Sequence, residues 1–147
     1  MVFSYGHEGT SNVVFFPLND SNYPQENGAK VLAIDSEKGP HVPRQDHSHC
    51  HQVLFYEGFL YVVDLGTDAL NVYRFNDQTG EVALVGERIS TAPGAGPRHI
   101  LFHPNKSLAF VCNELDTTVN VYRANPSVGQ LELAQTIKTR RPEDENG

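Results

Sequence analysis

Apolar and polar positions alternate along most of this chain in short runs, and turn-forming residues separate the runs. A period of two is typical of β-strands whose faces meet different surroundings. No segment shows the sustained period of about 3.6 residues that marks an amphipathic helix. The pattern therefore predicts an all-β chain. Its expected strands cover residues 12–18, 30–35, 52–56, 59–64, 69–76, 82–89, 99–102, 108–113, 118–124 and 130–139.

One unit of this pattern occurs twice in the second half of the chain. The first copy covers residues 51–75 and the second covers residues 98–124, and the motif NVYR is intact in both. Equivalent positions, such as Phe55 and Phe102, lie about 47 to 49 residues apart, and a strand-rich repeat of this length is typical of β-propeller blades. Each blade of a propeller is a four-stranded antiparallel sheet.

The length of the chain limits how much of a propeller it can form. Its 147 residues hold about three blades, whereas closed propellers have about four to eight. We therefore expect an incomplete propeller segment, whose open sheet edges predict self-association. The first blade should lack its innermost strand and most of its second. The expected parts are an incomplete blade at 1–38, a rim loop at 39–50, blades at 51–91 and 92–139, and a loop toward a missing blade at 140–147.

Charge and composition exclude several classes of protein. The net charge is −7, with 11 basic and 18 acidic residues, which argues against a nucleic-acid binder with a basic face. No apolar run reaches the roughly 18 residues of a membrane span, and the first residues lack the pattern of a signal peptide. The two cysteines do not make a disulfide framework. We therefore expect a cytoplasmic protein with neither nucleic acid nor membrane as a partner.

Ionisable residues occur at two kinds of position that should share one face of the propeller. Adjacent strands of a blade run in opposite directions, so the loop entering the first strand and the loop leaving the second open on the same side. The residues at these positions are His49, His51, Arg98, His99, Asp64 and Glu114. Imidazole, guanidinium and carboxylate groups on one rim can form an acid–base site with an anion clamp.

Structural roles stay open for the same residues. Arg98 could pair with a carboxylate and tie two blades together, and Glu114 could be that partner or cap a turn. Asp64 could brace the turn between the second and third strands. Three histidines alternate within residues 47–51 and could present one face to a metal, but no further ligand pair with zinc-like spacing appears, so no metal site is predicted. Cys112 should fill space between two sheets.

The segments HSHCHQVLF, GPRHILFHP and VCNELDTTVNVYR resemble the seven-bladed β-propeller lactonase family. This family includes propeller-type 6-phosphogluconolactonases and fungal carboxy-cis,cis-muconate cyclases, and the resemblance covers residues 5–147. It implies a role in carbohydrate metabolism, the hydrolysis of a sugar lactone, and no metal or organic cofactor. The implied catalytic residues are His51, Arg98 and Glu114, together with a second arginine from a later blade that would lie beyond Gly147.

The implied reaction begins when water attacks the carbonyl carbon of the lactone ring. Arg98 would stabilise the charge that develops on the carbonyl oxygen, or hold an anionic phosphate or carboxylate of the substrate. Glu114 or His51 would take the proton from water, and the other would protonate the leaving oxygen. The partner is a small anionic lactone or sugar acid. The expected substrate-binding residues are Arg44, His49, Asp64 and His99.

Two other functions fit the same residues. A lactonising cyclase acting on a muconate-type dicarboxylate would use the same arginine clamp and carboxylate. Alternatively, the propeller segment could be catalytically inactive and serve as a binding scaffold. Whether this chain acts as an enzyme is therefore an open question at the level of its sequence.

Overall fold

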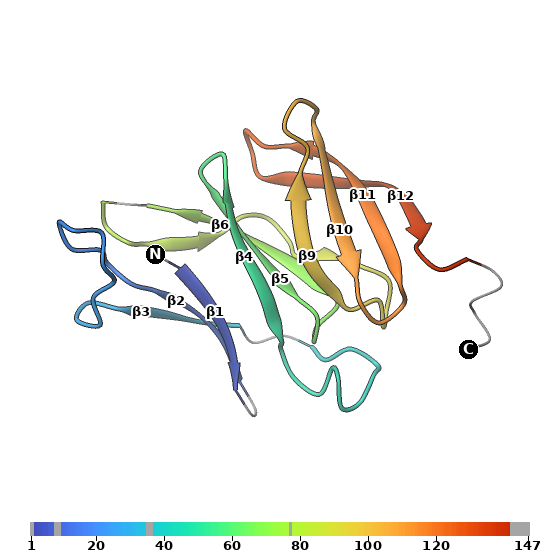
Figure 1. The fold of residues 1–147 in the computed structure, drawn as a ribbon, viewed down its shortest axis with the longest axis horizontal. Helices are drawn as coiled ribbons and strands as arrows, with labels where there is room; N and C mark the ends of the chain where they lie inside the picture. The colour runs from blue at the N-terminus through green and yellow to red at the C-terminus, as the bar shows by residue number, and fades with distance from the viewer. Residues whose placement is uncertain (1, 8–9, 35–36, 77, 142–147) are drawn as a thin grey trace.

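A computed structural model describes residues 2–7, 10–34, 37–76 and 78–141, with side chains from Ser11 onward. Every regular element in these ranges is a β-strand (Figure 1), as the alternating pattern predicts. These residues contain no helix of the length and apolar character that a membrane span requires. The strands form three antiparallel sheets, which we call the first, middle and last sheets.

The first sheet has the strand order β1-β2-β3. It consists of β1 (Val2–His7), β2 (Thr10–Phe15) and β3 (Lys30–Ile34). The prediction that the first blade lacks most of its second strand is wrong, because β1 occupies that place. It pairs with β2 along six positions, from Val2 opposite Phe15 to His7 opposite Thr10. Since β1 is the edge of this sheet, an innermost strand is not among the described residues.

The middle sheet is continuous except at its outer edge. It consists of β4 (Cys50–Tyr56), β5 (Phe59–Asp64), β6 (Ala69–Phe75), β7 (Val82–Leu84) and β8 (Ile89–Ser90). The single strand predicted at 82–89 is wrong, because the chain forms two short strands that both pair with β6. Gly86 lies between them at φ +64°, a left-handed conformation that glycine adopts without steric cost.

The last sheet has the order β12-β11-β10-β9. It consists of β9 (Pro97–Phe102), β10 (Leu108–Asn113), β11 (Thr118–Asn125) and β12 (Gln130–Lys138). The prediction of four antiparallel strands is confirmed for this unit, with β10 matching its predicted range. Most of the loop predicted at 140–147 lies outside the described residues.

Two apolar layers hold the three sheets together, one on each face of the middle sheet. Because the middle sheet is covered on both faces, all six residues of β5 are buried. The layer between the middle and last sheets contains Phe59, Tyr61, Val63, Leu70, Val72, Ile100, Phe102, Ala109, Val111, Tyr122 and Ala124. The layer between the first and middle sheets contains Val13, Phe15, Ile34, Cys50, Leu60, Val62 and Tyr73.

The last sheet buries only one of its faces within the described chain. Along β10, Ala109 and Val111 are buried, whereas Phe110 is partly exposed and Cys112 is exposed. The prediction that Cys112 fills space between two sheets is therefore wrong for this chain. Its side chain lies on the face that no described sheet covers.

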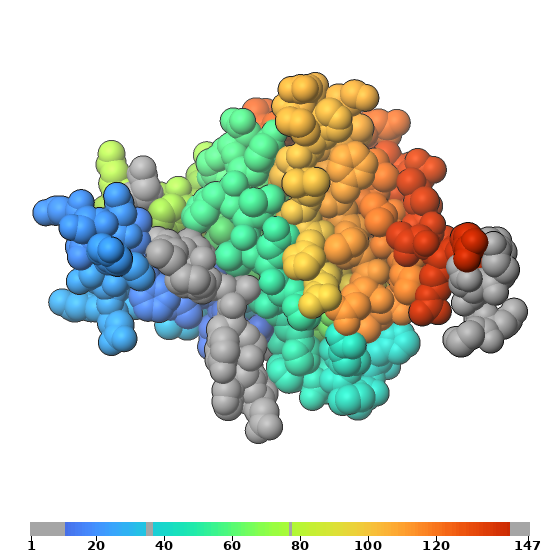
Figure 2. Space-filling view, in the orientation of Figure 1, coloured from blue at the N-terminus to red at the C-terminus, as the bar shows by residue number. Residues whose placement is uncertain are grey.

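The strand directions place three loops at one end of the blades. Strand β9 starts, and strand β10 ends, at the lower end of the last sheet in Figure 1, where the loop 39–50 also lies. In the space-filling view this loop lies directly below the last sheet (Figure 2). This end, which we call the rim, carries the ionisable residues considered next.

Candidate functional site at the rim

Glu114 lies between two arginines at the rim. Nη2 of Arg44 donates a hydrogen bond to Oε1 of Glu114, and Nε of Arg98 lies 3.3 Å from Oε2. Arg44 comes from the loop 39–50, Arg98 from the start of β9, and Glu114 follows the end of β10. Arg98 and Glu114, which the sequence analysis placed on one face, are therefore in contact, and Arg44, expected to bind substrate, joins them.

The pKa of the Glu114 carboxyl group is lowered, and the hydrogen bond from Arg44 is the largest cause. Glu114 is therefore ionised at neutral pH. Its Oε2 accepts no hydrogen bond from any side chain or backbone group that the structure describes, so the 3.3 Å approach of Arg98 is an ion pair without hydrogen-bond alignment. The side chains of Arg44 and Arg98 are 52% and 47% exposed, which leaves both cations accessible to a dissolved anion.

His51 belongs to the same electrostatic environment. Partial burial of its imidazole is the largest cause that lowers its pKa, followed by the charge of Arg98, while Glu114 acts in the opposite direction. His49 and His99 also lower this pKa. The imidazole of His51 is therefore mainly neutral near pH 7, the form that accepts a proton.

Asp64 does not face solvent. Its side chain is fully buried, and Oδ1 accepts hydrogen bonds from the backbone N–H groups of His49 at 2.7 Å and Gly66 at 3.0 Å. Its Oδ2 accepts a hydrogen bond from the hydroxyl of Ser48 at 2.6 Å. The expected contact between Asp64 and substrate is therefore corrected: this carboxylate braces the loop that carries the histidines.

The other expected substrate-binding residues differ in where they point. His49 is directed toward Asp46, with Nε2 of His49 3.0 Å from Oδ1 of Asp46. His99 is an exposed residue of β9, opposite Cys112 in the strand pairing. Of the four residues expected to bind substrate, Arg44 alone is seen in direct contact with Glu114 among the contacts described.

A second buried carboxylate, which the sequence analysis missed, connects the rim loops. Oδ2 of Asp68 accepts a hydrogen bond from Gly94 N at 2.6 Å, and Oδ1 accepts one from Gly96 N at 2.8 Å and one from Nε2 of Gln45 at 2.7 Å. Gln45 is itself fully buried. Asp68 thus fixes the loop that precedes Arg98 and the loop that contains Arg44.

The backbone extends this connection to Glu114. Gly96 O accepts a hydrogen bond from Glu114 N at 2.8 Å, and Ala95 O accepts one from Leu115 N at 3.0 Å. Gly96 adopts φ +62°, and a Cβ at this position would lie 2.5 Å from Cγ of Leu115. A glycine is therefore required where the three loops meet. The Gly-Pro-Arg-His sequence signals this entry loop, but nothing in the sequence shows that Asp68 is its buried acceptor.

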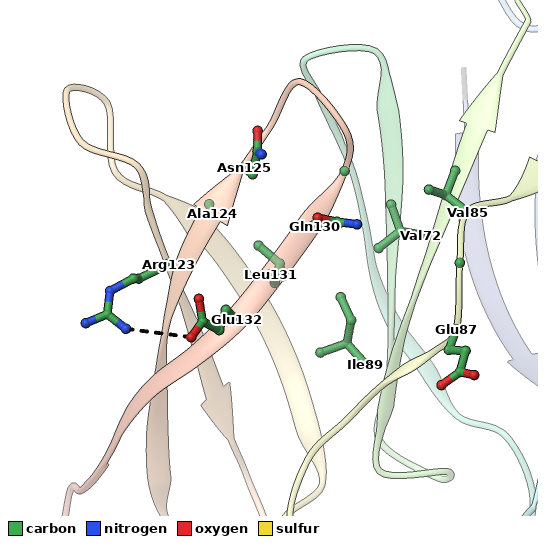
Figure 3. A pocket seen from close by; sticks show the side chains of 12 residues that line it. Val72, Val85, Glu87, Ile89, Arg123, Ala124, Asn125, Gln130, Leu131 and Glu132 are labelled. Atoms are coloured by element: carbon green, nitrogen blue, oxygen red, sulfur yellow. Dashed lines mark ion pairs between the residues drawn. The ribbon is translucent and has the colours of Figure 1, made fainter.

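A groove of about 520 Å³ lies away from the rim, between the outer strands of the middle and last sheets (Figure 3). Figure 3 shows Arg123 paired with Glu132, at 4.0 Å, on one wall. Val72, Ile89 and Leu131 supply apolar lining. His51, Arg98 and Glu114 are not among its lining residues, so the groove and the ionisable rim cluster are separate features.

Comparison with known proteins decides the family. A family model described as a lactonase with a seven-bladed β-propeller matches residues 2–147. The chain belongs to this seven-bladed propeller lactonase family. The resemblance inferred from the sequence motifs and the predicted propeller architecture are thereby confirmed.

Several relatives of this lactonase-family chain have known names or structures. The 6-phosphogluconolactonase of Bacillus subtilis is 38% identical over 133 residues, which are 89% of this chain and 36% of the relative. A Lactobacillus plantarum structure has a TM-score of 0.82 at 26% identity, covering 97% of this chain and 40% of that chain. The periplasmic gluconolactonase of Pseudomonas aeruginosa has a TM-score of 0.74 at 27% identity, covering 90% and 36%. The chain therefore spans between a third and two fifths of the length of these relatives.

Proposed function

We propose that this chain forms part of a lactone hydrolase of the 6-phosphogluconolactonase type. The observation that carries the proposal is the meeting of Arg44 and Arg98 at Glu114, beside His51, at the rim. The Bacillus subtilis relative, at 38% identity, supports the substrate class. The site therefore combines an anion clamp with a group that can accept a proton.

The two arginines are the proposed clamp. These two guanidinium groups and the Glu114 carboxylate together carry one net positive charge, in a chain whose net charge is −7. This local charge offsets the long-range repulsion of an anionic substrate. Arg98 donates to the carbonyl oxygen as negative charge develops there, and Arg44 is available for a phosphate or carboxylate of the substrate.

We assign the role of general base to His51 rather than to Glu114. Glu114 is held by Arg44 and its pKa is lowered, so it is a weak proton acceptor, and its proposed role is to orient the two guanidinium groups. His51 accepts a proton from water while the water oxygen bonds to the carbonyl carbon. The ring C–O bond then breaks, and the leaving oxygen takes the proton back from His51, which gives the open sugar acid.

The proposal includes a cytoplasmic location. It is supported by Cys50 and Cys112, which are both free thiols, a state favoured in reducing compartments. The Pseudomonas aeruginosa relative is described as periplasmic, so the shared fold does not determine the compartment. Fractionation of the native host followed by immunodetection tests it, and recovery with periplasmic markers contradicts it.

The experiment that tests the function uses a complete propeller containing this segment. Arg98→Ala should reduce the hydrolysis of 6-phosphogluconolactone by about 100-fold, the scale of losing one donor to an oxyanion. Arg98→Lys should restore only part of the rate, because a point charge does not reproduce the planar contact of a guanidinium group. Arg123→Ala is the matched control, since this exposed arginine of β11 lies outside the rim.

The same experiment separates the alternatives. If Arg98→Ala unfolds the protein while the folded fraction keeps full activity, Arg98 is a structural tie between blades and its catalytic assignment fails. Faster turnover of a carboxymuconate substrate favours the lactonising cyclase. If the complete protein turns over neither substrate but still binds sugar acids, the propeller is a binding scaffold.

A further inference from the structure

Asp46, His47 and His49 form a compact group in the loop before β4. Oδ1 of Asp46 lies 2.8 Å from Nδ1 of His47 and 3.0 Å from Nε2 of His49. The two imidazole rings have centroids 3.9 Å apart, and one ligand atom from each residue lies within 4.8 Å of the others. Three groups that commonly bind metals therefore converge on one point.

These distances are close to those in a bound metal site. Zinc binds imidazole nitrogen and carboxylate oxygen at about 2.0–2.2 Å, so ligand atoms at tetrahedral angles lie about 3.3–3.5 Å apart. The two distances from Asp46 are shorter than this by about half an ångström. Small rotations of the side chains are therefore enough to admit an ion between the carboxylate and the two imidazoles.

The loop that carries these ligands is fixed by the middle sheet. Asp64, which is fully buried, accepts hydrogen bonds from the hydroxyl of Ser48 and the backbone of His49. Leu65 N donates to His49 O at 3.0 Å. A Cβ at Gly66 would lie 1.8 Å from the carbonyl oxygen of His47. Hydrogen bonds and close packing against the turn after β5 thus fix the backbone between the two histidines. Binding of an ion therefore costs little further conformational entropy of this loop.

The exposure of the three side chains suits a site that is open on one side. His47 is 19% exposed and His49 is 29% exposed, while Asp46 is 44% exposed. Water can therefore complete the coordination of an ion held by these three residues. The nearby cation Arg44 donates a hydrogen bond to Glu114, a carboxylate outside the cluster that offsets part of its charge.

We propose that Asp46, His47 and His49 bind one Zn²⁺ or a similar divalent transition metal ion at the rim. Two imidazoles with one carboxylate are a ligand set typical of such ions. The inference goes beyond lactone hydrolysis, because binding of the ion requires neither a substrate nor Arg98. Sequence spacing did not predict it: the third ligand is an aspartate adjacent to the first histidine, and only the fold of the loop turns all three together.

Titration of the purified, chelator-treated protein tests the site. Isothermal titration with Zn²⁺ should show one ion per chain, bound with a dissociation constant of about 10 μM or tighter, and Co²⁺ should give visible absorption bands of a low-symmetry site. His47→Ala, His49→Ala and Asp46→Asn should each weaken Zn²⁺ binding by at least about tenfold, since even outer-shell partners of a metal cost that much. His103→Ala should leave binding unchanged, because this histidine lies in the β9–β10 turn, outside the cluster.

Circular dichroism without metal shows whether each variant keeps the β-sheet spectrum of the wild type. If His49→Ala fails to fold, His49→Gln retains a side chain of similar shape and must still lose affinity. Arg98→Ala should bind Zn²⁺ normally, so failure of the lactonase proposal and failure of the metal proposal give different results. Absence of saturable Zn²⁺ binding by the wild type at 100 μM, or equal affinity in the three ligand variants and His103→Ala, overturns the proposal.

Discussion

The middle and last blades repeat one sequence pattern, but they differ in how much of it they bury. Tyr61 and Val63 of the middle blade are fully buried. Their equivalents in the last blade are Phe110, which is partly exposed, and Cys112, which is exposed. The face that carries Tyr61 and Val63 packs against the last sheet, and no described sheet covers the equivalent face of the last blade. Burial of a blade strand is therefore set by the neighbouring sheet as much as by the strand itself.

At the rim the two blades differ in sequence rather than in surroundings, because equivalent backbone positions carry different side chains. His51 and Arg98 occupy the same place at the entry to a first strand, and Leu65 and Glu114 occupy the same place after a second strand. Leu65 is 1% exposed, whereas Glu114 faces the two arginines. The repeated fold thus provides fixed positions on which side-chain chemistry can change without changing the strands.

The largest expected difference between the blades is the cost of removing an aromatic core residue. Tyr61→Ala should lower the free energy of unfolding by about 3–5 kcal/mol, the range for a large buried ring. Phe110→Ala should cost about 1–2 kcal/mol, since its ring already meets solvent. Urea unfolding followed by circular dichroism measures both. Equal losses would show that the outer face of the last blade is covered in solution.

An asparagine placed at the turn between the second and third strands should act differently in the two blades. Asp68→Asn should lower the free energy of unfolding by about 2 kcal/mol, because an amide NH₂ would face one of the N–H donors that the carboxylate now accepts from. Thr117 has the equivalent position and φ +56°. Thr117→Asn should be neutral or slightly stabilising, since asparagine tolerates this conformation better than a β-branched residue.

The same urea experiment measures these two variants. A loss of stability in Thr117→Asn as large as that in Asp68→Asn would contradict the role given to the Asp68 carboxylate. It would indicate instead that any change at this turn disturbs the blade.

High pH should destabilise the chain through the tyrosines of the middle blade. Burial raises the pKa of Tyr61 and of Tyr73 to about 12. Below about pH 10 both groups are protonated in the folded and unfolded chains, so their contribution is fully present. Between about pH 10 and 12 the unfolded chain loses these protons first, and stability should fall by about 2 kcal/mol for each tyrosine.

Unfolding curves at pH 8, 10 and 11.5 check this expectation, and Tyr61→Phe is the matched variant. Tyr61→Phe should reduce the alkaline loss of stability. At neutral pH it should be no less stable than the wild type, because the hydroxyl of Tyr61 is buried without a hydrogen-bond partner among the described residues. A pH dependence identical to that of the wild type would show that Tyr61 does not contribute.

The smallest expected effect concerns self-association, which we propose for the isolated chain. Leu101 lies on the uncovered face of the last sheet and is 68% exposed, whereas its equivalent Leu54 packs against the core. Leu101→Ser should weaken self-association about fivefold, about 1 kcal/mol of apolar contact, with little change in stability. Leu54→Ser should instead lower stability. Sedimentation equilibrium tests the first effect, and a wild-type chain that stays monomeric at high concentration would contradict it.

The sequence predicted the features that depend on local pattern and on the repeat. Alternation located most strands, and the repeat placed Arg98 and Glu114 on one rim. It missed β1, and it joined β7 and β8 into one strand although Gly86 interrupts the pairing. The first error concerns a strand that is defined by its pairing with β2. The second concerns one glycine whose left-handed backbone the alternation of apolar and polar residues does not show.

The remaining errors concern burial. Asp64 and Asp68 resemble surface turn residues in the sequence, but backbone N–H groups from other loops donate to both of them. Cys112 reads as a core residue because it lies in an apolar strand, yet it is exposed. Alternation shows which residues share a face of a sheet. It does not show whether another part of the chain covers that face.

Four hydrogen bonds between successive blades run from a backbone N–H group of the later blade to a side chain that comes earlier in the sequence. Cys50 N donates to the hydroxyl of Ser11, and Ile100 N donates to Oε1 of Gln52, just as Gly94 and Gly96 donate to the earlier Asp68. In each case the earlier sheet supplies the side-chain acceptor, and the later sheet supplies the backbone donor. A chain emerging from the ribosome therefore has each acceptor already synthesised when the next entry strand appears, so the blades can dock one after another during translation.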